Sequence, residues 1–301
     1  MMKNNQTLYA AGLLGVLALL YFFTQTGEID TKTIDSDMFT VEKDAITEVE
    51  LKNPNVSLVM TKDETGWKLD DYPVDTVKMN QFLDLFSELT PDRLITKNSE
   101  KHINYEVPND GVRFLAKSAD SKELLNLVIG KQGANYQETF VREIASDMVY
   151  AVKSSLSQYK NKSQRDFWDR SIARIDVNQI NEVSFLGEIN YTLKRDGGAW
   201  TYNGELVDFD KTTDMLRPLE NLTASNFADI IGAENTPYLE IKLKYEDGST
   251  TDLTCYLKDA NGALLLIKVS GNDKIFEFSK SSLNRYKKQL SDLTTDPQPE
   301  T

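Results

Sequence analysis

The sequence predicts an α+β fold: an N-terminal transmembrane helix followed by two tandem, duplicated β-rich domains, each with one main helix packed on an antiparallel meander sheet. Three observations lead to this prediction. The segment KSSLSQYK at residues 153–160 returns as KSSLNRYK at residues 280–287, with six of eight positions identical. The segment DAITEVEL at residues 44–51 is echoed by NQINEVSF at residues 178–185, and such self-similarity is typical of a folding unit used twice. Residues 8–23 form a continuous apolar run.

The apolar run contains no charge and no proline, and its length is close to the ~20 residues that span a bilayer as a helix. A cleaved signal peptide is the alternative, but no small-x-small cleavage pattern follows the run. Lys3 precedes the run and Glu28 and Asp30 follow it, so the positive-inside rule predicts a cytosolic N-terminus. We therefore expect an uncleaved anchor at residues 1–24, a tether at residues 25–38, and a single-pass protein of the inner (cytoplasmic) membrane whose bulk lies on the periplasmic, extracytoplasmic side.

The first repeat domain is predicted at residues 39–160. Its strands are expected around residues 46–51, 58–60, 67–69, 112–114, 125–129, 140–141 and 149–152. Asp75 offers an N-cap, and the apolar residues that follow it recur at helical spacing, which predicts one amphipathic helix that ends before Pro91. These apolar residues are Met79, Phe82, Leu83, Phe86 and Leu89.

The second repeat domain is predicted at residues 176–290. Trp200 answers Trp67 after 133 residues, whereas the closing KSSL motif recurs after only 127. The second copy has therefore lost residues, and we expect the loss in the loop around Lys101–Gly111. Pro218 falls inside the second predicted helix, where its missing N–H should shorten or bend that helix.

The repeated KSSL motif is expected to close each domain as a short helix. Ser154 or Ser155 would cap this helix in the first copy, with Leu156 and Tyr159 packed inward. Residues 161–175 are predicted to connect the domains, with the aromatic pair Phe167-Trp168 packed rather than free, and residues 291–301 to form a disordered tail. The motif predicts architecture and indicates no activity.

The composition argues against several classes of function. With 34 basic and 47 acidic residues the formal net charge is −13, which repels nucleic-acid backbones and anionic lipid surfaces. The single cysteine, Cys255, alternates with leucines and is expected in a core, and the single histidine, His102, is expected at the surface. Neither a phosphate-binding glycine loop nor a G-x-S-x-G nucleophile elbow occurs in the sequence.

The sequence offers no catalytic residue and no cofactor site, and its best metal candidate is weak. Asp208, Asp210 and Asp214 follow the start of a calcium-loop pattern, but the glycine and the distal glutamate of such a loop are missing. Asp208 is also expected to cap a helix, so we predict no metal. Trp67 and Trp200 could stack on sugars, although their positions on strands favour core packing.

Several motifs together resemble a known family. They lie at Ile46–Leu51, Trp67–Asp75, Val149–Val152 and Phe167–Arg170. The chain after Thr24 resembles the bacterial domain-of-unknown-function family whose members often accompany gliding-motility-type ABC-2 transporters. The resemblance implies an extracytoplasmic auxiliary component of a membrane transport system, with an ABC-2 permease as its partner and no catalytic residues to carry over.

The expected function is therefore that of a non-enzymatic, membrane-anchored accessory protein. The alternative is an extracytoplasmic glycan- or peptide-binding protein, or a hydrolase, that uses a cleft between the domains. Two carboxyl groups at the separation found in glycosidases, one of them with a raised pKa, would favour this alternative.

Overall fold

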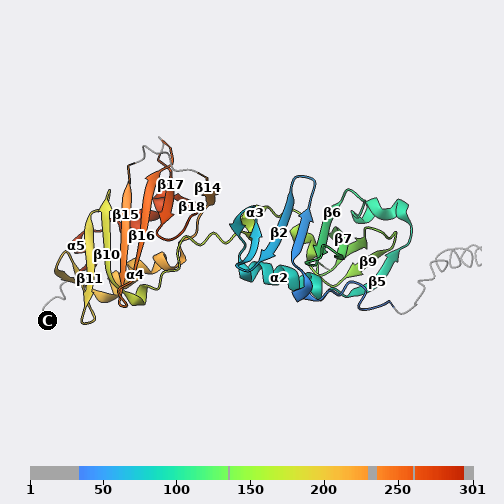
Figure 1. Ribbon diagram of the computed structural model, residues 1–301, viewed down its shortest axis with the longest axis horizontal. Helices are drawn as coiled ribbons and strands as arrows, with labels where there is room; N and C mark the ends of the chain where they lie inside the picture. Colours follow the sequence, from blue (N-terminus) through green and yellow to red (C-terminus); the bar gives the residue numbers. More distant parts are fainter. Residues whose placement is uncertain (1–33, 135, 230–235, 260–261, 295–301) are drawn as a thin grey trace, which may run out of the picture. The chain divides into compact units, whose positions relative to one another are not determined.

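The chain divides into two units, with the boundary between Phe167 and Trp168. A computed structural model of the protein describes residues 34–134, 136–229, 236–259 and 262–294 (Figure 1). The predicted anchor at residues 1–24, most of the predicted tether and the end of the predicted tail lie outside these ranges. Within them, no helix is long and apolar enough to cross a membrane.

The first unit is built on one antiparallel sheet of nine strands in the order β4-β3-β2-β1-β6-β7-β8-β9-β5 (Figure 1). The strands are β1 (Glu48–Lys52), β2 (Ser57–Asp63), β3 (Gly66–Leu69), β4 (Tyr72–Pro73), β5 (Pro91–Thr96), β6 (Val112–Lys117), β7 (Glu123–Gln132), β8 (Thr139–Glu143) and β9 (Val149–Val152). The helices are α2 (Thr76–Ser87), α3 (Gln164–Phe167) and the 3-10 helices η1 (Lys43–Ala45), η2 (Ser99–Tyr105) and η3 (Leu156–Tyr159).

Helix α2 packs on one face of this sheet and connects its two edge strands, β4 and β5. Asp75 caps the helix as predicted, because its carboxylate accepts the backbone N–H groups of Val77 and Lys78 at 3.0 and 3.1 Å. The predicted apolar stripe is buried, and the ring of Phe86 stacks on Phe114 of β6 with centroids 3.6 Å apart. The C-terminal end of α2 therefore lies at the β5 edge of the sheet.

The opposite face of the sheet carries a second, smaller core around Val107, Val128 and Val149. Arg142 of β8 is buried beside it, and only 2 % of the residue is exposed. Its guanidinium donates to five acceptors, which are the carbonyls of Val107, Glu143, Ile144 and Ser146 and the side-chain oxygen of Asn109. Burial lowers the pKa of Arg142. Backbone carbonyls thus surround the guanidinium of Arg142. By bonding to them, Arg142 holds two loops on this face of the sheet.

The second unit repeats the architecture of the first, with a nine-stranded antiparallel sheet in the order β13-β12-β11-β10-β15-β16-β17-β18-β14. Its strands are β10 (Ile180–Gly187), β11 (Tyr191–Asp196), β12 (Ala199–Tyr202), β13 (Glu205–Val207), β14 (Asn226–Ala228), β15 (Leu239–Tyr245), β16 (Thr250–Leu257), β17 (Leu264–Val269) and β18 (Ile275–Ser279). Its helices are α4 (Phe209–Leu216), α5 (Leu290–Leu293) and the 3-10 helices η4 (Val177–Gln179), η5 (Arg217–Asn221) and η6 (Lys280–Tyr286).

Corresponding strands of the two units pair in corresponding registers. Leu51 of β1 lies opposite Phe114 of β6, and Phe185 of β10 lies opposite Ile241 of β15. The connection from β5 to β6 is longer than that from β14 to β15, so most of the residues lost by the second copy come from the predicted loop. The identical order and register confirm that one folding unit is used twice.

The repeat continues beyond the KSSL motif. The carbonyl of Phe167, at the end of α3, accepts the backbone N–H of Asp75, and the carbonyl of Leu293, at the end of α5, accepts that of Asp208. In each short helix the third residue is an aspartate that accepts the backbone N–H of the residue before the helix: Asp166 accepts that of Ser163, and Asp292 accepts that of Gln289. Both helices thus tie the end of a unit to the start of its main helix, although they lie in the segments predicted as the connection and the tail.

The predicted α+β fold class is wrong, because the chain is mainly β. In the described ranges the longest helix is α2 with 12 residues, α4 has 8, and the KSSL motifs form 3-10 turns without the predicted serine cap bond. Pro218 limits the second helix as expected, since α4 ends at Leu216 and continues as η5. Short edge strands such as β4 and β13, which carry too few residues to show a period of two, complete the sheets.

Candidate functional site

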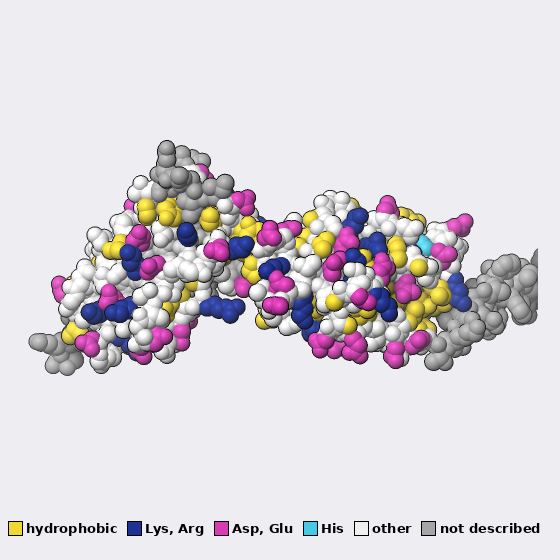
Figure 2. Space-filling model, viewed as in Figure 1, with side chains coloured by type: hydrophobic (Ala, Val, Ile, Leu, Met, Phe, Trp, Pro, Cys, Tyr) yellow, Lys and Arg dark blue, Asp and Glu magenta, His cyan; other side chains and the backbone are white. Residues whose placement is uncertain are grey.

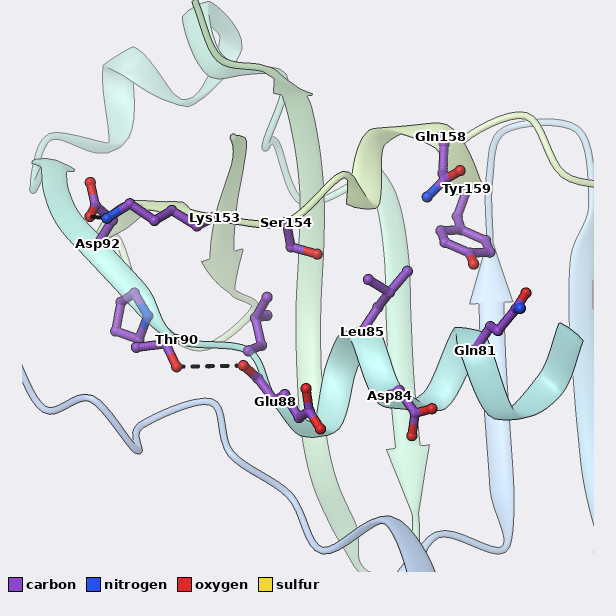
Figure 3. Close-up of a pocket in the computed structure, with 12 residues that line it drawn as sticks. Gln81, Asp84, Leu85, Glu88, Thr90, Asp92, Lys153, Ser154, Gln158 and Tyr159 are labelled. Carbon is purple, nitrogen blue, oxygen red and sulfur yellow. Dashed lines mark hydrogen bonds and ion pairs between the residues drawn. The ribbon is translucent and has the colours of Figure 1, made fainter. Parts of the chain in front are cut away.

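The first unit carries an open groove between the C-terminal half of α2 and the KSSL motif, with a volume of about 720 Å³. It is lined by Gln81, Asp84, Leu85, Glu88, Leu89, Thr90, Pro91, Asp92, Lys153, Ser154, Gln158 and Tyr159. Figure 3 shows Leu85 extending from α2 toward η3 and the ring of Tyr159 extending from η3 toward α2, so the two side chains form the apolar middle of the groove. We call this cavity the first groove.

The second unit carries an equivalent cavity, which we call the second groove, with a volume of about 280 Å³. It is lined by Pro218, Asn221, Leu222, Thr223, Phe278, Ser282, Arg285 and Tyr286. At the repeat spacings, Pro218 stands in the place of Leu85, Asn221 in that of Glu88, and Arg285 in that of Gln158. The repeated motif therefore lines a groove at the same place in both units.

The two grooves differ in how far they are filled. Phe278 at the end of β18 contributes to the wall of the second groove, and Val152 occupies the corresponding register position in the first unit. Tyr286 is 1 % exposed, whereas its counterpart Tyr159 is only partly buried, and its ring is tilted against those of Phe82 and Phe86. Phe278 and Tyr286 fill part of the second groove, and a separate cavity of about 420 Å³, lined in part by Asp214, Pro218 and Arg285, lies beside it.

The ionisable groups of the first groove are held in ion pairs. Lys153 lies 2.5 Å from Asp92, and this contact holds the pKa of the Asp92 carboxyl below its usual value of 3.8 (Figure 3). Asp84 forms an ion pair with Lys43 of η1. Burial raises the pKa of the Tyr159 hydroxyl, so this tyrosine stays neutral at physiological pH. The groove thus presents fixed charges around an apolar middle.

Carboxyl groups with displaced pKa values are all shifted downward in the part of the chain that the structure describes. They are Asp63, Asp92, Asp120, Asp166, Glu188 and Asp247, and hydrogen bonds to lysine, serine, threonine or backbone groups lower the pKa in each case. A glycosidase acid needs the opposite shift, because it must keep its proton near neutral pH. These carboxylates already accept hydrogen bonds from side chains or backbone groups of the chain.

The weak metal candidates belong to the start and the exposed side of α4. Asp208 caps the helix by accepting the Lys211 N–H at 2.9 Å, and Asp214 lies 3.4 Å from Arg217. Asp210 is exposed in the first turn. Among the residues that the structure places, no three His, Cys, Asp or Glu side chains come together closely enough to hold a metal ion.

The remaining singled-out residues are structural. Cys255 is buried, as predicted, and burial raises the pKa of its thiol to about 12. Trp200 is 1 % exposed and forms part of the core of the second unit, whereas Trp67 is half-buried on β3. His102 lies in η2, where a ring nitrogen is 3.0 Å from the Asp147 carbonyl.

Sequence reasoning identified the KSSL motif but missed the groove beside it. Leu156 is buried as predicted, and so is its counterpart Leu283, yet the first motif also lines the cavity through Lys153, Ser154 and Tyr159. One feature of the sequence pointed to this groove. Asp84 and Glu88 lie one turn apart on the exposed side of the predicted helix, near its end. Their proximity to the motif depends on long-range strand order, which the sequence alone did not supply.

Fold and groove together define the chain as a duplicated, mainly β protein with one groove per unit. Residues 68–242 match the family described as "Domain of unknown function (DUF4340)". The match covers more than half of the chain, which therefore belongs to this family. It begins within β3 and ends within β15, so it runs from the first unit into the second. No curated protein matches the chain, and no solved structure does.

Proposed function

We propose that this protein is a non-enzymatic accessory protein whose two units bind protein partners, as an auxiliary component of an ABC-type transport system. The observation that carries the proposal is the recurrence of a groove at the repeated motif in both units. A binding module that has been duplicated keeps its docking surface in both copies, whereas its contacts can diverge.

The electrostatics of the grooves support binding rather than chemistry. In the first groove, the ion pair with Lys153 lowers the pKa of the Asp92 carboxyl. Figure 2 shows acidic side chains gathered along the lower edge of the first unit in this view. Fixed surface charges of this kind mainly steer partners and set specificity.

The transport setting of the proposal comes from sequence. The motifs at Trp67–Asp75 and Phe167–Arg170 resemble a family found beside gliding-motility-type ABC-2 transporters. The apolar run at residues 8–23 supports an anchor in the cytoplasmic membrane, with both units on the extracytoplasmic side. In that setting an ABC-2 permease is the proposed partner.

Co-purification of the full chain tests the proposal. After mild detergent extraction and chemical crosslinking, we expect an ABC permease to be recovered with the tagged protein, and the crosslinks to map to either groove. A variant with an unrelated membrane anchor in place of residues 1–24 separates partner binding from shared membrane location. Recovery of the protein alone, without permease crosslinks, would contradict the proposal.

Topology is tested separately. A protease added to intact spheroplasts should digest the chain after Thr24, and permeabilised spheroplasts provide the control for full digestion. Complete protection in intact spheroplasts would place both units on the cytoplasmic side and overturn the proposed location.

A further inference from the structure

The C-terminal end of α2 carries charges of the wrong sign for a stable helix. A helix C-terminus has partial negative charge and favours Lys or Arg, yet α2 has no basic residue in its last turn. Instead it presents Asp84 near the end and Glu88 as the C-cap, one turn apart. Two like charges at this spacing also repel each other. Departures from a local stability rule are expected where a surface has a function.

The second unit obeys the rule at the equivalent place. Arg217 follows α4 directly, 133 residues after Asp84, and Asn221 replaces Glu88. Arg217 lies 3.4 Å from Asp214, so the end of this helix carries a compensated cation. The unfavourable arrangement is therefore specific to the unit with the larger groove.

Part of the negative charge in the first groove is already neutralised. Lys43 pairs with Asp84, and Lys153 pairs with Asp92. Glu88 forms no ion pair with any residue in the described ranges, and it stands where the carbonyls of the last helical turn point. A cation placed beside Glu88 would be attracted by the carboxylate and by the helix terminus together.

The middle of the groove is apolar and open. Leu85 and Tyr159 face each other across it (Figure 3). Leu89 and Pro91 also line it, and Pro91 is the first residue of β5. Leu89 is 2 % exposed and forms part of the floor, whereas Leu85 and Tyr159 are only partly buried. The volume of about 720 Å³ is in the range of pockets that enclose a few side chains.

We propose that the first groove binds a segment of a protein partner that presents a lysine or arginine beside an apolar side chain. The cation lies against Glu88 and the end of α2, and the apolar side chain packs between Leu85 and Tyr159. This inference rests on the proposed function and names the chemistry of the partner. The second groove is lined by Arg285, and Asn221 stands there in the place of Glu88, so it disfavours the same segment.

Binding of synthetic peptides to the full chain tests this inference. The probes are capped octapeptides of serine and leucine with a central leucine pair followed by lysine, norleucine or glutamate. A fluorescent label on Gln158→Cys reports binding in the first groove, and the buried native Cys255 does not react with the label. We expect the lysine peptide to bind at least about fivefold more tightly than the norleucine peptide, because a rim ion pair and a helix terminus each contribute modestly.

The variants Glu88→Gln and Glu88→Lys separate binding from folding. Either change should weaken the lysine peptide, and the charge reversal should weaken it about tenfold, while the Tm stays the same or rises because an acid leaves the helix C-terminus. The matched control is Glu64→Lys in the exposed β2–β3 turn, which makes the same charge change away from the groove and should leave binding unaltered.

Three results would overturn the inference: no peptide binds, the lysine and norleucine peptides bind equally, or Glu88→Lys binds the lysine peptide as tightly as Glu64→Lys does. These results leave the proposed function standing if the wild-type chain still recovers a permease. Loss of permease recovery with intact peptide binding would instead contradict the transport proposal alone.

Discussion

The two units share their strand order and registers, but they differ where the main helix ends. In the first unit α2 runs for 12 residues and ends among acids, beside an open groove of about 720 Å³. In the second, α4 runs for 8 residues and Pro218 lies just beyond its end. The equivalent surface there carries two cavities of about 280 and 420 Å³, which share Pro218 and Arg285. The sheet tolerates little change because a one-residue slip would turn its core face outward. The end of the main helix is not constrained in this way. The side chains that differ between the two units are therefore found there.

The largest expected difference concerns the two equivalent tryptophans. Trp200 is 1 % exposed, so Trp200→Ala should destabilise the second unit by about 3–5 kcal/mol. Trp67 is half-buried, and Trp67→Ala should cost the first unit about 1–2 kcal/mol. Urea unfolding followed by peptide-level hydrogen exchange measures each unit separately. Equal losses in the two variants would contradict the difference in burial between the two tryptophans.

Arg142 sharpens the comparison on the other face of the sheet. Arg142→Met leaves buried carbonyls without donors and should destabilise the first unit by about 3 kcal/mol. Lys268 of β17 holds the equivalent register position, because Thr254 lies opposite it as Val128 lies opposite Arg142. Lys268 is exposed, so Lys268→Met should change stability by less than about 0.5 kcal/mol. A large effect of the lysine variant would contradict the assignment.

Exchanging proline between the helices tests why they differ in length. Leu85→Pro removes a backbone donor inside α2 and should destabilise the first unit by about 3 kcal/mol. Pro218→Leu should be close to neutral and should extend α4, which circular dichroism would record as a small gain in helix. If Pro218→Leu leaves the helical signal unchanged, the packing of η5 rather than the proline limits α4.

The smallest expected effect is a difference in alkaline stability. Burial raises the pKa of Cys255 from 9.0 to about 12 and that of Tyr286 from 10.0 to about 12. The unfolded chain therefore loses these protons at lower pH than the folded chain does. The stability of the second unit is then full below about pH 9 and falls as the pH rises toward 12.

The measurement is urea unfolding at pH values from about 8 to about 11, with pulse proteolysis to identify second-unit fragments. Cys255→Ala should reduce the slope between about pH 9 and pH 10, because the ordinary pKa of the thiol, 9.0, is lower than the 10.0 of the buried Tyr286. The first unit contains no cysteine and serves as the internal reference. A slope that is the same with and without the thiol would show that Cys255 is not protected in the way its burial indicates.

Local signals in the sequence predicted the parts of the fold that depend on neighbouring residues. Asp75 caps α2, Pro218 limits α4 and Cys255 is buried, because a capping side chain, a missing N–H and a strand period act over a few residues. The duplication itself was evident from the KSSL motif. The helical share of the fold was overestimated, because the motif makes only a 3-10 turn and β4 and β13 are too short to show a pattern.

The candidate site depends on contacts that local patterns do not contain. Asp84 and Ser154 lie 70 residues apart in the chain, and they meet because α2 ends at the edge where β5 pairs with β9. The docking of α3 and α5 was missed for a related reason, since a backbone carbonyl makes the contact and any residue can provide one. The shared aspartates Asp166 and Asp292 were the only sequence trace of it.

The continuity of each unit in the chain has a consequence for synthesis on the ribosome. Every strand of the first sheet, and the α3 carbonyl that closes it, comes before Trp168. All strands of the first sheet are synthesised before the second unit emerges from the ribosome. The edge strands β5 and β9 can therefore pair before the matching strands β14 and β18 exist. Tandem copies with equal registers are prone to exchange strands with each other during folding. The order of translation separates them in time.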